Sequence, residues 1–277
     1  MILASRSLIV TGDDFGFSSG VNRAILEAHE KGVLTSASLM VTGAAFEEAV
    51  ALARTHPGLA VGLHLVATCG QAVLSPSRIP HLVDRKGRFL SSPVRAGLRY
   101  QFSRQARHEL GLEIRAQLER FQQTGLPLSH VDGHLHMHMH PVILRVLIEL
   151  ADEFGIKAIR LPSEELRIAI RLDRSGLLGK VVLSWIFGWL RRFGERQLKG
   201  RGIRFADRVY GLLQSGQVTE EYLLGLIPRI RSKEVEIYLH PAISTELEAL
   251  LSQRVYKALV LNGFELTRHN ANRCVEC

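Results

Sequence analysis

Short apolar runs alternate along the chain with longer segments whose apolar positions recur every three to four residues. The first pattern is typical of buried strands and the second of amphipathic helices. Strand-like runs lie at residues 8–10, 38–41, 59–63, around 128, 158–161 and 235–239. Helical patterns lie at about residues 21–31, 44–53, 103–123, 141–154 and 245–261, with a further long helical region before residue 235.

This order of elements predicts the fold class. Strands separated by helices indicate β-α-β units and a parallel sheet. We therefore expect a single α/β domain over residues 1–277, a distorted seven-stranded (β/α) barrel with parallel strands. In barrels of this kind, sites are assembled at the C-terminal ends of the strands. Polar residues at those ends are therefore the first candidates for function.

The tract from His130 to His140 reads His-Val-Asp-Gly-His-Leu-His-Met-His-Met-His. Its five histidines and Asp132 share one parity, so an extended strand would place all six side chains on one face. Imidazole and carboxylate both bind divalent cations. A surface His-rich run is the alternative, but Leu128 before the tract and the helical pattern from Pro141 indicate a strand leading into a helix. One cation takes three or four protein ligands, so some of these histidines must have other tasks.

Other predicted strands also end in polar residues. Asp13 and Asp14 follow the first strand, His64 follows the strand at residues 59–63, and His240 follows the strand at residues 235–239. With the histidine tract, four separate segments therefore aim ligand-type groups at one rim of the predicted barrel. Consecutive residues point in different directions, so one aspartate can bind a metal while the other acts as a base. The alternative is that both aspartates are simply solvated in a turn.

Composition restricts the class of protein further. The chain has 277 residues, of which 46% are hydrophobic and 22% charged, the range of an ordinary globular protein. Cys69, Cys274 and Cys277 do not form a disulfide framework and fit a reducing compartment. We interpret the final Cys-Val-Glu-Cys as a tail. The N-terminus shows no secretory signal, so we expect a cytoplasmic protein, with the inner face of the membrane as its other location.

An apolar and basic insert lies at about residues 166–208. It contains eleven Lys or Arg and three Asp or Glu, so 11 − 3 = +8, which equals the net charge of the whole chain. Within it, the apolar run at residues 181–190 includes Trp185, Phe187 and Trp189. This run is too short to span a bilayer, which needs about 20 residues, but it suits a helix that contacts a membrane interface. A buried helix or a homodimer contact is the alternative, and the apolar character argues against a nucleic-acid partner.

Four ordered motifs resemble those of the YdjC-like carbohydrate deacetylase family. The similarity covers about residues 8–263 and is closest to the hopanoid-biosynthesis-associated deacetylase subgroup. The family pattern usually reads Asp-Ser-His-His-His in the third motif, where this chain has Asp-Gly-His-Leu-His. The motifs are Thr11-Gly-Asp-Asp-Phe-Gly16, Gly62-Leu-His-Leu65, His130-Val-Asp-Gly-His-Leu-His-Met-His138 and Leu239-His-Pro-Ala242.

The resemblance implies specific roles for residues at the matching positions. It implies that Asp14, His64 and His134 bind one divalent metal ion. It implies that Asp13 is the catalytic base and that His240 is an active-site histidine, either the general acid or an orienting group. The missing middle histidine of the third motif would point to the opposite face, so we expect the metal site to be kept.

The chemistry of amide hydrolysis agrees with these roles. A cation with three protein ligands keeps positions open for water and for the acetyl carbonyl. Asp13 can accept a proton from the water, and His240 or His138 can protonate the departing amine. Asp132, His136 and His138 are candidates for orienting ligands or contacting substrate. Two imidazoles and one carboxylate suit zinc, cobalt, nickel or manganese, and the resemblance also allows magnesium.

These observations predict a metal-dependent N-deacetylase. Its substrate would carry an N-acetylglucosaminyl group, on a glycosylated hopanoid lipid according to the resemblance or on soluble chito-oligosaccharides. A surface-exposed helix at residues 181–190 would favour the lipid. A non-catalytic metal- or sugar-binding protein is the alternative class, and an Asp13 side chain that points away from the cation would favour it. A metal-dependent phosphoesterase would typically need two metals and more carboxylates.

Overall fold

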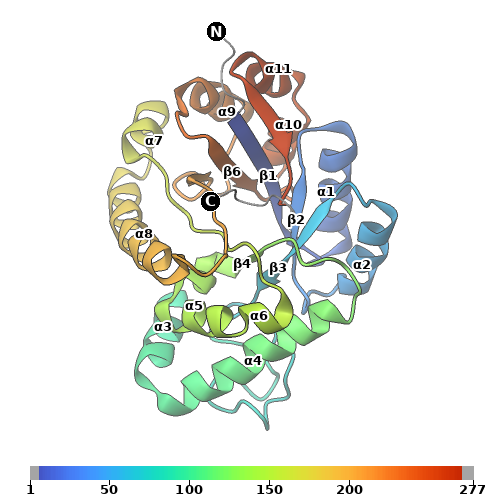
Figure 1. The fold of residues 1–277 in the computed structure, drawn as a ribbon, viewed down its shortest axis with the longest axis vertical. Coiled ribbons are helices and arrows are strands. Elements are labelled where there is room, and N and C mark those ends of the chain that lie inside the picture. The colour runs from blue at the N-terminus through green and yellow to red at the C-terminus, as the bar shows by residue number, and fades with distance from the viewer. Residues whose placement is uncertain (1–5, 270–277) are drawn as a thin grey trace.

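Within residues 6–269, which the computed structural model describes, seven strands form one curled sheet surrounded by helices (Figure 1). All strand pairs are parallel, and the order is β4-β3-β2-β1-β6-β5, with β7 beside β1. The predicted distorted barrel with parallel strands is confirmed. The strands are β1 (Arg6–Phe15), β2 (Ser36–Leu39), β3 (Ala60–Leu65), β4 (Val131–Gly133), β5 (Arg208–Tyr210), β6 (Glu234–Leu239) and β7 (Phe264–Thr267).

Helices cover the outer face of this sheet (Figure 1). Most lie where the periodicity predicts them, but the predicted helix at residues 245–261 is divided in two. Ser252 divides it, because its side-chain oxygen accepts hydrogen bonds from Arg254 and Val255 and caps the second helix. The helices are α1 (Ser19–Lys31), α2 (Phe46–Thr55), α3 (Pro93–Phe102), α4 (Arg104–Gln122), α5 (Pro141–Glu149), α6 (Ala151–Phe154), α7 (Leu166–Leu172), α8 (Leu177–Leu198), α9 (Glu220–Leu226), α10 (Ser244–Leu251) and α11 (Gln253–Leu261).

The edges of the sheet are joined by an irregular segment. The predicted strand at residues 158–161 forms only isolated bridges, from Ile159 to Val131 of β4 and from Ala158 to Arg204. Ser163 then pairs with Val209 of β5. This segment therefore bridges β4 and β5, which is why the barrel is distorted. It also carries Arg160 into the barrel interior.

The interior of the barrel is polar, and the apolar core lies between the strands and the outer helices. Strand residues alternate between the two sides. In β1, Leu8 and Val10 belong to the apolar core, whereas Thr11 and Asp13 lie among buried polar side chains. The polar residues buried inside the barrel are Thr11, Asp13, Ser38, His64, His130, Asp132, Arg160 and Glu236.

The histidine tract does not stay extended, so the condition for a single face of six side chains is not met. Strand β4 ends at Gly133, and a 3₁₀ turn, η1 (His134–Met139), follows. Leu135 and His136 have φ of 51° and 55°, in the left-handed region. An alternation of polar and apolar residues cannot reveal such a turn, and the turn sends the histidines in different directions.

Two strands are longer than the apolar pattern indicates. Asp13 and Asp14 lie within β1, and His64 lies within β3, rather than in the loops that follow. The last residues of these strands have buried polar partners, so the strands continue through their polar residues. No helix in the described part of the chain is long and apolar enough to cross a membrane.

Candidate active site

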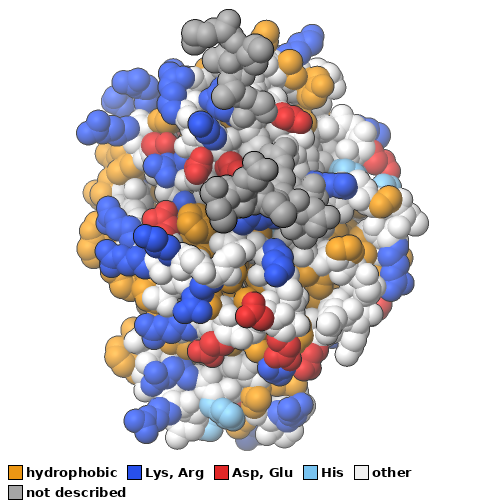
Figure 2. Space-filling view, in the orientation of Figure 1, with side chains coloured by type: hydrophobic (Ala, Val, Ile, Leu, Met, Phe, Trp, Pro, Cys, Tyr) orange, Lys and Arg blue, Asp and Glu red, His pale blue; other side chains and the backbone are white. Residues whose placement is uncertain are grey.

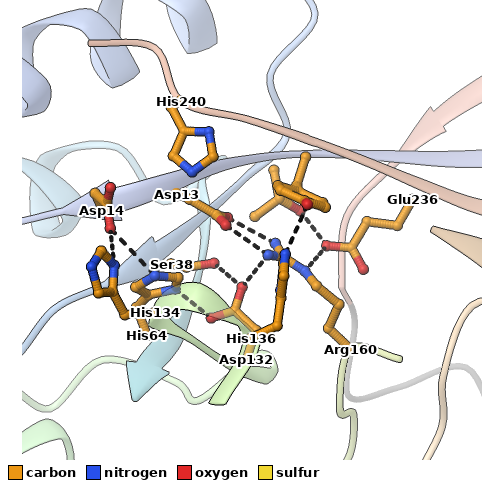
Figure 3. Close-up of polar contacts among 12 residues, drawn as sticks. Asp13, Asp14, Ser38, His64, Asp132, His134, His136, Arg160, Glu236 and His240 are labelled. Atoms are coloured by element: carbon orange, nitrogen blue, oxygen red, sulfur yellow. Dashed lines mark hydrogen bonds and ion pairs between the residues drawn. The ribbon is translucent and has the colours of Figure 1, made fainter. Parts of the chain in front are cut away.

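Asp14, His64 and His134 converge at the C-terminal ends of β1 and β3 and at the start of η1 (Figure 3). The Oδ1 atom of Asp14 lies 3.3 Å from Nε2 of His64 and 3.1 Å from Nδ1 of His134. One ligand atom from each residue lies within 4.8 Å of the others. The structure thus brings together the three residues that the sequence predicts as metal ligands. Their role as ligands stays a prediction.

A backbone irregularity separates the two consecutive aspartates. The register between β1 and β2 shifts between Gly12 and Phe15, and Asp14 has a φ of 65°. A bulge of this kind redirects a side chain and is common beside active sites. Asp13 keeps the inward direction of the regular strand, whereas Asp14 turns toward His64 and His134. The predicted division of tasks between the two aspartates therefore has a structural basis.

Asp132 orients His64. Its Oδ1 atom lies 2.8 Å from Nδ1 of His64, so Nε2 faces Asp14. Ser38 donates a 2.6 Å hydrogen bond to the other oxygen of Asp132. A carboxylate behind a histidine in this way sets the tautomer of a metal ligand.

Arg160 pairs with the buried carboxylates next to these three residues, and the sequence prediction missed it. Its guanidinium donates two hydrogen bonds to Asp13, at 2.8 and 2.9 Å, and one to Glu236 at 2.9 Å. It also lies 2.8 Å from Asp132, and its side chain is fully buried. An arginine within the apolar run at residues 158–161 was the signal, because a buried cation requires buried anions.

The acidic surroundings shift the pKa values of the site. Burial raises the pKa of Asp13, and Arg160 opposes this rise. Burial also opposes ionisation of Asp14, but hydrogen bonds from His134 and His64 outweigh it and hold the pKa of Asp14 below its ordinary value. For His64, burial is outweighed by the nearby Asp132 carboxylate, and the pKa rises to about 10. The raised pKa of His64 reflects the carboxylates around it, which would also favour a cation.

The donor set fits a single divalent cation. Two imidazole nitrogens and one carboxylate oxygen are a common ligand set for zinc and similar metals. Their separations of 3.1 and 3.3 Å match the roughly 3.3 Å between ligands of a tetrahedral zinc with bonds of about 2.0 Å. In the described part of the chain a second cluster joins Asp13, Asp132 and His64, but the guanidinium of Arg160 already pairs with both of its carboxylates.

His240 follows β6 and lies on the opposite side of Asp13 from Arg160 (Figure 3). Its backbone N–H donates to the buried Glu246 carboxylate, which also lies 3.6 Å from Nδ1 of the ring. Burial disfavours the charged ring, but Glu246, Asp13 and Asp14 outweigh it and raise the pKa of His240. A raised pKa favours the protonated ring, which is the form that can donate a proton.

The other histidines of the tract have partners away from the triad. His136 hydrogen-bonds through Nε2 to the Tyr238 hydroxyl at 2.8 Å, and His138 binds the Arg160 carbonyl through Nε2 at 2.8 Å. Burial lowers the pKa of His138 to about 4, which argues against it as the acid. The His140 side chain caps α5. Of the five histidines, only His134 therefore joins the triad.

The predicted membrane-contact residues divide between the two sides of α8. Trp185 and Trp189 are exposed at the surface. Phe187 instead packs inward, with its ring centroid 5.6 Å from that of His136. The first two residues remain candidates for a contact with a partner, and Phe187 connects α8 to the site. Cys274 and Cys277 lie outside the described residues.

The curled parallel sheet, with acidic and histidine side chains gathered at the ends of its strands, places the chain in the class of (β/α)-barrel proteins whose site lies at the strand ends. The chain belongs to the YdjC-like protein family, whose sequence profile matches residues 7–274. The family membership predicted from the four motifs is confirmed. Membership of the hopanoid-associated subgroup stays a prediction.

Relatives with curated names agree with the predicted enzyme class. The chain is 49% identical to a carbohydrate deacetylase of Brevibacillus brevis over 149 residues, 54% of this chain and 57% of that protein. It is 35% identical to a chitooligosaccharide deacetylase of Escherichia fergusonii over 281 residues, 94% of this chain and 97% of the relative. The first match thus spans little more than half of the relative's length, whereas the second is nearly complete.

A solved structure supports the fold. It is that of a candidate cellobiose-phosphate cleavage protein from Enterococcus faecalis V583, with a TM-score of 0.74 and 24% identity. The similarity covers 96% of this chain and 98% of that one. At this level of identity the similarity establishes the shared architecture.

Proposed function

We propose that this protein is a metal-dependent N-deacetylase that hydrolyses the acetamide of an N-acetylglucosaminyl group. One observation carries the proposal. Asp14, His64 and His134 present ligand atoms within 4.8 Å of one another, and Asp13 lies in an overlapping cluster that shares His64. A cation site with a separate carboxylate beside it is the arrangement that metal-assisted amide hydrolysis requires.

In the proposed mechanism Asp14, His64 and His134 hold the divalent cation, whose identity among zinc, magnesium, cobalt, nickel and manganese is open. Such a cation supplies Lewis acidity, which polarises the acetyl carbonyl and makes the attacking water more acidic. Asp132 keeps Nδ1 of His64 engaged, so Nε2 stays available as a ligand atom. A cation held by three protein ligands would also be able to bind water and substrate.

Asp13 acts as the general base. Its two oxygens accept hydrogen bonds from Arg160, which fixes the carboxylate beside the triad. Burial raises the pKa of Asp13, so it is a stronger base than a free aspartate. It accepts the proton of the attacking water as the new carbon–oxygen bond forms.

His240 acts as the general acid. It lies on the far side of Asp13 from Arg160, and its pKa is raised. It donates a proton to the amine nitrogen as the carbon–nitrogen bond breaks, and acetate and the free amino sugar leave. Glu246 holds the ring through contacts with the backbone and Nδ1.

The position of Asp13 argues against a protein that only binds metal or sugar. Such a protein needs no base, yet Asp13 is buried beside His64 and held by two charge-assisted hydrogen bonds. A phosphoesterase with two metals is also disfavoured. Arg160 occupies the position between Asp13 and Asp132 where a second cation would have to bind.

As the substrate we propose a lipid-linked sugar, and a glycosylated hopanoid is the lipid that the subgroup resemblance suggests. The exposed tryptophans of α8 support a lipid-linked substrate. The close rival is a soluble chito-oligosaccharide, in accordance with the name of the Escherichia fergusonii relative. The same proposal places the protein in the cytoplasm, at the inner face of the membrane.

Acetate release tests the activity. The purified chain would be assayed on N-acetylated glycolipids and on chito-oligosaccharides, each with and without a chelator. We expect chelator-sensitive release that a divalent metal restores. Acetate release that survives complete metal removal would contradict the metal-dependent mechanism. Activity confined to soluble oligosaccharides would contradict the lipid-linked substrate.

A further inference from the structure

Helix α8 buries two of its basic side chains, Lys180 and Arg191, and exposes its two tryptophans. Lys180 donates to Asp173 at 2.6 Å, and Arg191 donates to the carbonyls of Leu161 and Ala206. Both basic side chains are buried. A surface helix normally shows the reverse arrangement, with its apolar face toward the core.

The outward face carries a continuous apolar stripe. Leu178, Val182, Trp185 and Trp189 recur at intervals of four, three and four residues, the spacing of one helical face. Their exposed fractions are 82%, 55%, 78% and 56%. We call these four residues the outer stripe. Isolated exposed apolar residues are ordinary, but a contiguous stripe with both tryptophans of the chain indicates a surface that binds something.

Basic residues border the outer stripe. Arg192 and Arg196 continue its spacing into the last turns of α8, and both are exposed. Arg171, in the last turn of α7, and Arg174, between α7 and α8, are exposed as well. Figure 2 shows apolar and basic side chains intermixed along the edge of the molecule where α8 lies in Figure 1. The apolar stripe therefore lies within a positively charged surface.

The outer stripe lies on an element that contacts the candidate site. Phe187, on the inner side of α8, packs against His136 of η1. Helix α3 also contacts η1, and it too exposes an apolar row, Val94, Leu98 and Phe102. The turn that carries His134 thus lies between two helices with exposed apolar rows.

An anionic bilayer surface matches this combination of charge and apolarity. Tryptophan and arginine favour the interface, where rings reach the acyl chains and cations meet phosphate headgroups. At about 33 Å, a helix of this length can lie flat in that interface. A second copy of the chain is a poorer match, because two such faces would bring like charges together.

We propose that the outer stripe and Arg192 and Arg196 dock the protein on an anionic membrane surface, with η1 and the candidate site beside the headgroups. The docking contact itself does not depend on any catalytic role. Its consequence, access of the site to a lipid-linked acetylated sugar, rests on the proposed function. Docking would keep the enzyme at the surface that holds its substrate.

Vesicle binding of the full chain tests the proposal directly. Both tryptophans lie in the outer stripe, so intrinsic fluorescence reports on this face alone. With phosphatidylglycerol-containing vesicles we expect a blue shift of the emission and co-sedimentation, and much weaker binding to pure phosphatidylcholine. Absence of both signals on anionic vesicles would overturn the proposal.

Matched variants locate the contact. Trp185→Glu/Trp189→Glu should lower the partition coefficient about 100-fold, because each large apolar side chain contributes at least a factor of ten. Arg192→Glu/Arg196→Glu should lower it about tenfold on anionic vesicles only. Leu261→Glu, at an equally exposed apolar position of α11, should bind as the wild type does. Equal binding by the tryptophan double variant would contradict docking through α8.

Two further readouts separate the alternatives. Hydrolysis of a soluble chito-oligosaccharide should be unchanged in the tryptophan double variant, which also shows that the variant is folded. If the wild type hydrolyses none of the substrates, the proposed function is rejected, but the docking result is unaffected. A dimer in light scattering that the double variant disrupts, without vesicle binding, would assign the face to a second copy and overturn the proposal.

Discussion

The barrel interior and helix α8 both bury positive charge, but they do so with opposite consequences. Inside the barrel, Arg160 pairs with three carboxylates, and Asp14, His64 and His134 bring their ligand atoms within 4.8 Å of one another beside it. In α8, Lys180 and Arg191 fasten the helix to the rest of the molecule, and its apolar face points outward. The buried network lies beside a candidate cation site, whereas the outer face of α8 is apolar and exposed.

This difference shows where each partner must come from. Buried charges are stable only when paired, so the surplus negative charge around Asp13, Asp14 and Asp132 calls for a cation within the site. An exposed apolar stripe gains free energy only when another surface covers it. We therefore propose that the site binds an ion and that α8 binds a membrane surface. Substitutions in the two regions should affect different measurements.

Removing Arg160 should cause the largest change. Arg160→Met leaves Asp13, Asp132 and Glu236 buried without their shared cation, and loss of one partner of a buried pair costs about 3–5 kcal/mol of unfolding free energy. Urea denaturation measures it. Trp185→Ala, on the exposed side of α8, serves as the control and should change stability by less than about 0.5 kcal/mol. Similar losses in both variants would contradict the contrast between the two regions.

Asp13→Asn should retain the metal and lose most activity. The amide cannot accept the proton from water, and a positioned general base contributes about 100- to 10,000-fold to the rate. Metal analysis and acetate release on the same sample test this. Asp152→Asn, at an exposed position, should behave as the wild type does. Undiminished turnover in Asp13→Asn would remove Asp13 from the role of base.

Part of this arrangement could be predicted from the sequence, and the reason differs by residue. Parallel strands bring their C-terminal ends to one rim, which predicted that polar residues from separate segments would converge. The family resemblance then selected Asp14, His64 and His134 among them as the metal ligands. Arg160 was missed because it lies in an irregular segment whose pairing no periodicity reveals. The histidines of the tract do not share one face, because Leu135 and His136 adopt left-handed backbone that the alternating pattern cannot reveal.

The region of α8 shows a similar limit. The apolar run and its basic flanks were visible in the sequence. The sequence did not show which face of the helix packs against the barrel and which face is exposed. The structure resolves it through Lys180 and Arg191, whose partners lie on the inner side. Phe187 was grouped with the two tryptophans, yet it faces His136.

The pH dependence should identify the general acid. Because the pKa of His240 is raised above 6.5, the ring is protonated at lower pH and loses its proton as the pH rises through that raised pKa. Activity of the wild type should therefore decline on the alkaline side. His240→Gln should lower kcat/KM about 100-fold and remove this decline. An unchanged alkaline limb in the variant would assign the decline to another group.

Asp132→Asn should have a smaller effect, on metal affinity rather than on chemistry. The amide can still contact Nδ1 of His64 but carries no charge, and loss of such an orienting group typically weakens metal binding about 10- to 100-fold. Competition with a chelating dye measures it. Ser38→Ala removes only the hydrogen bond to Asp132 and should weaken binding less. A reversed order would contradict the orienting role of Asp132.

Metal stoichiometry tests the central claim most directly. Equilibrium dialysis against zinc, followed by elemental analysis, should find a single bound ion per wild-type chain and almost none in His134→Ala. His108→Ala, which removes an exposed histidine, should bind as the wild type does. Full occupancy in His134→Ala, or no high-affinity ion in the wild type, would contradict the view that Asp14, His64 and His134 hold one cation.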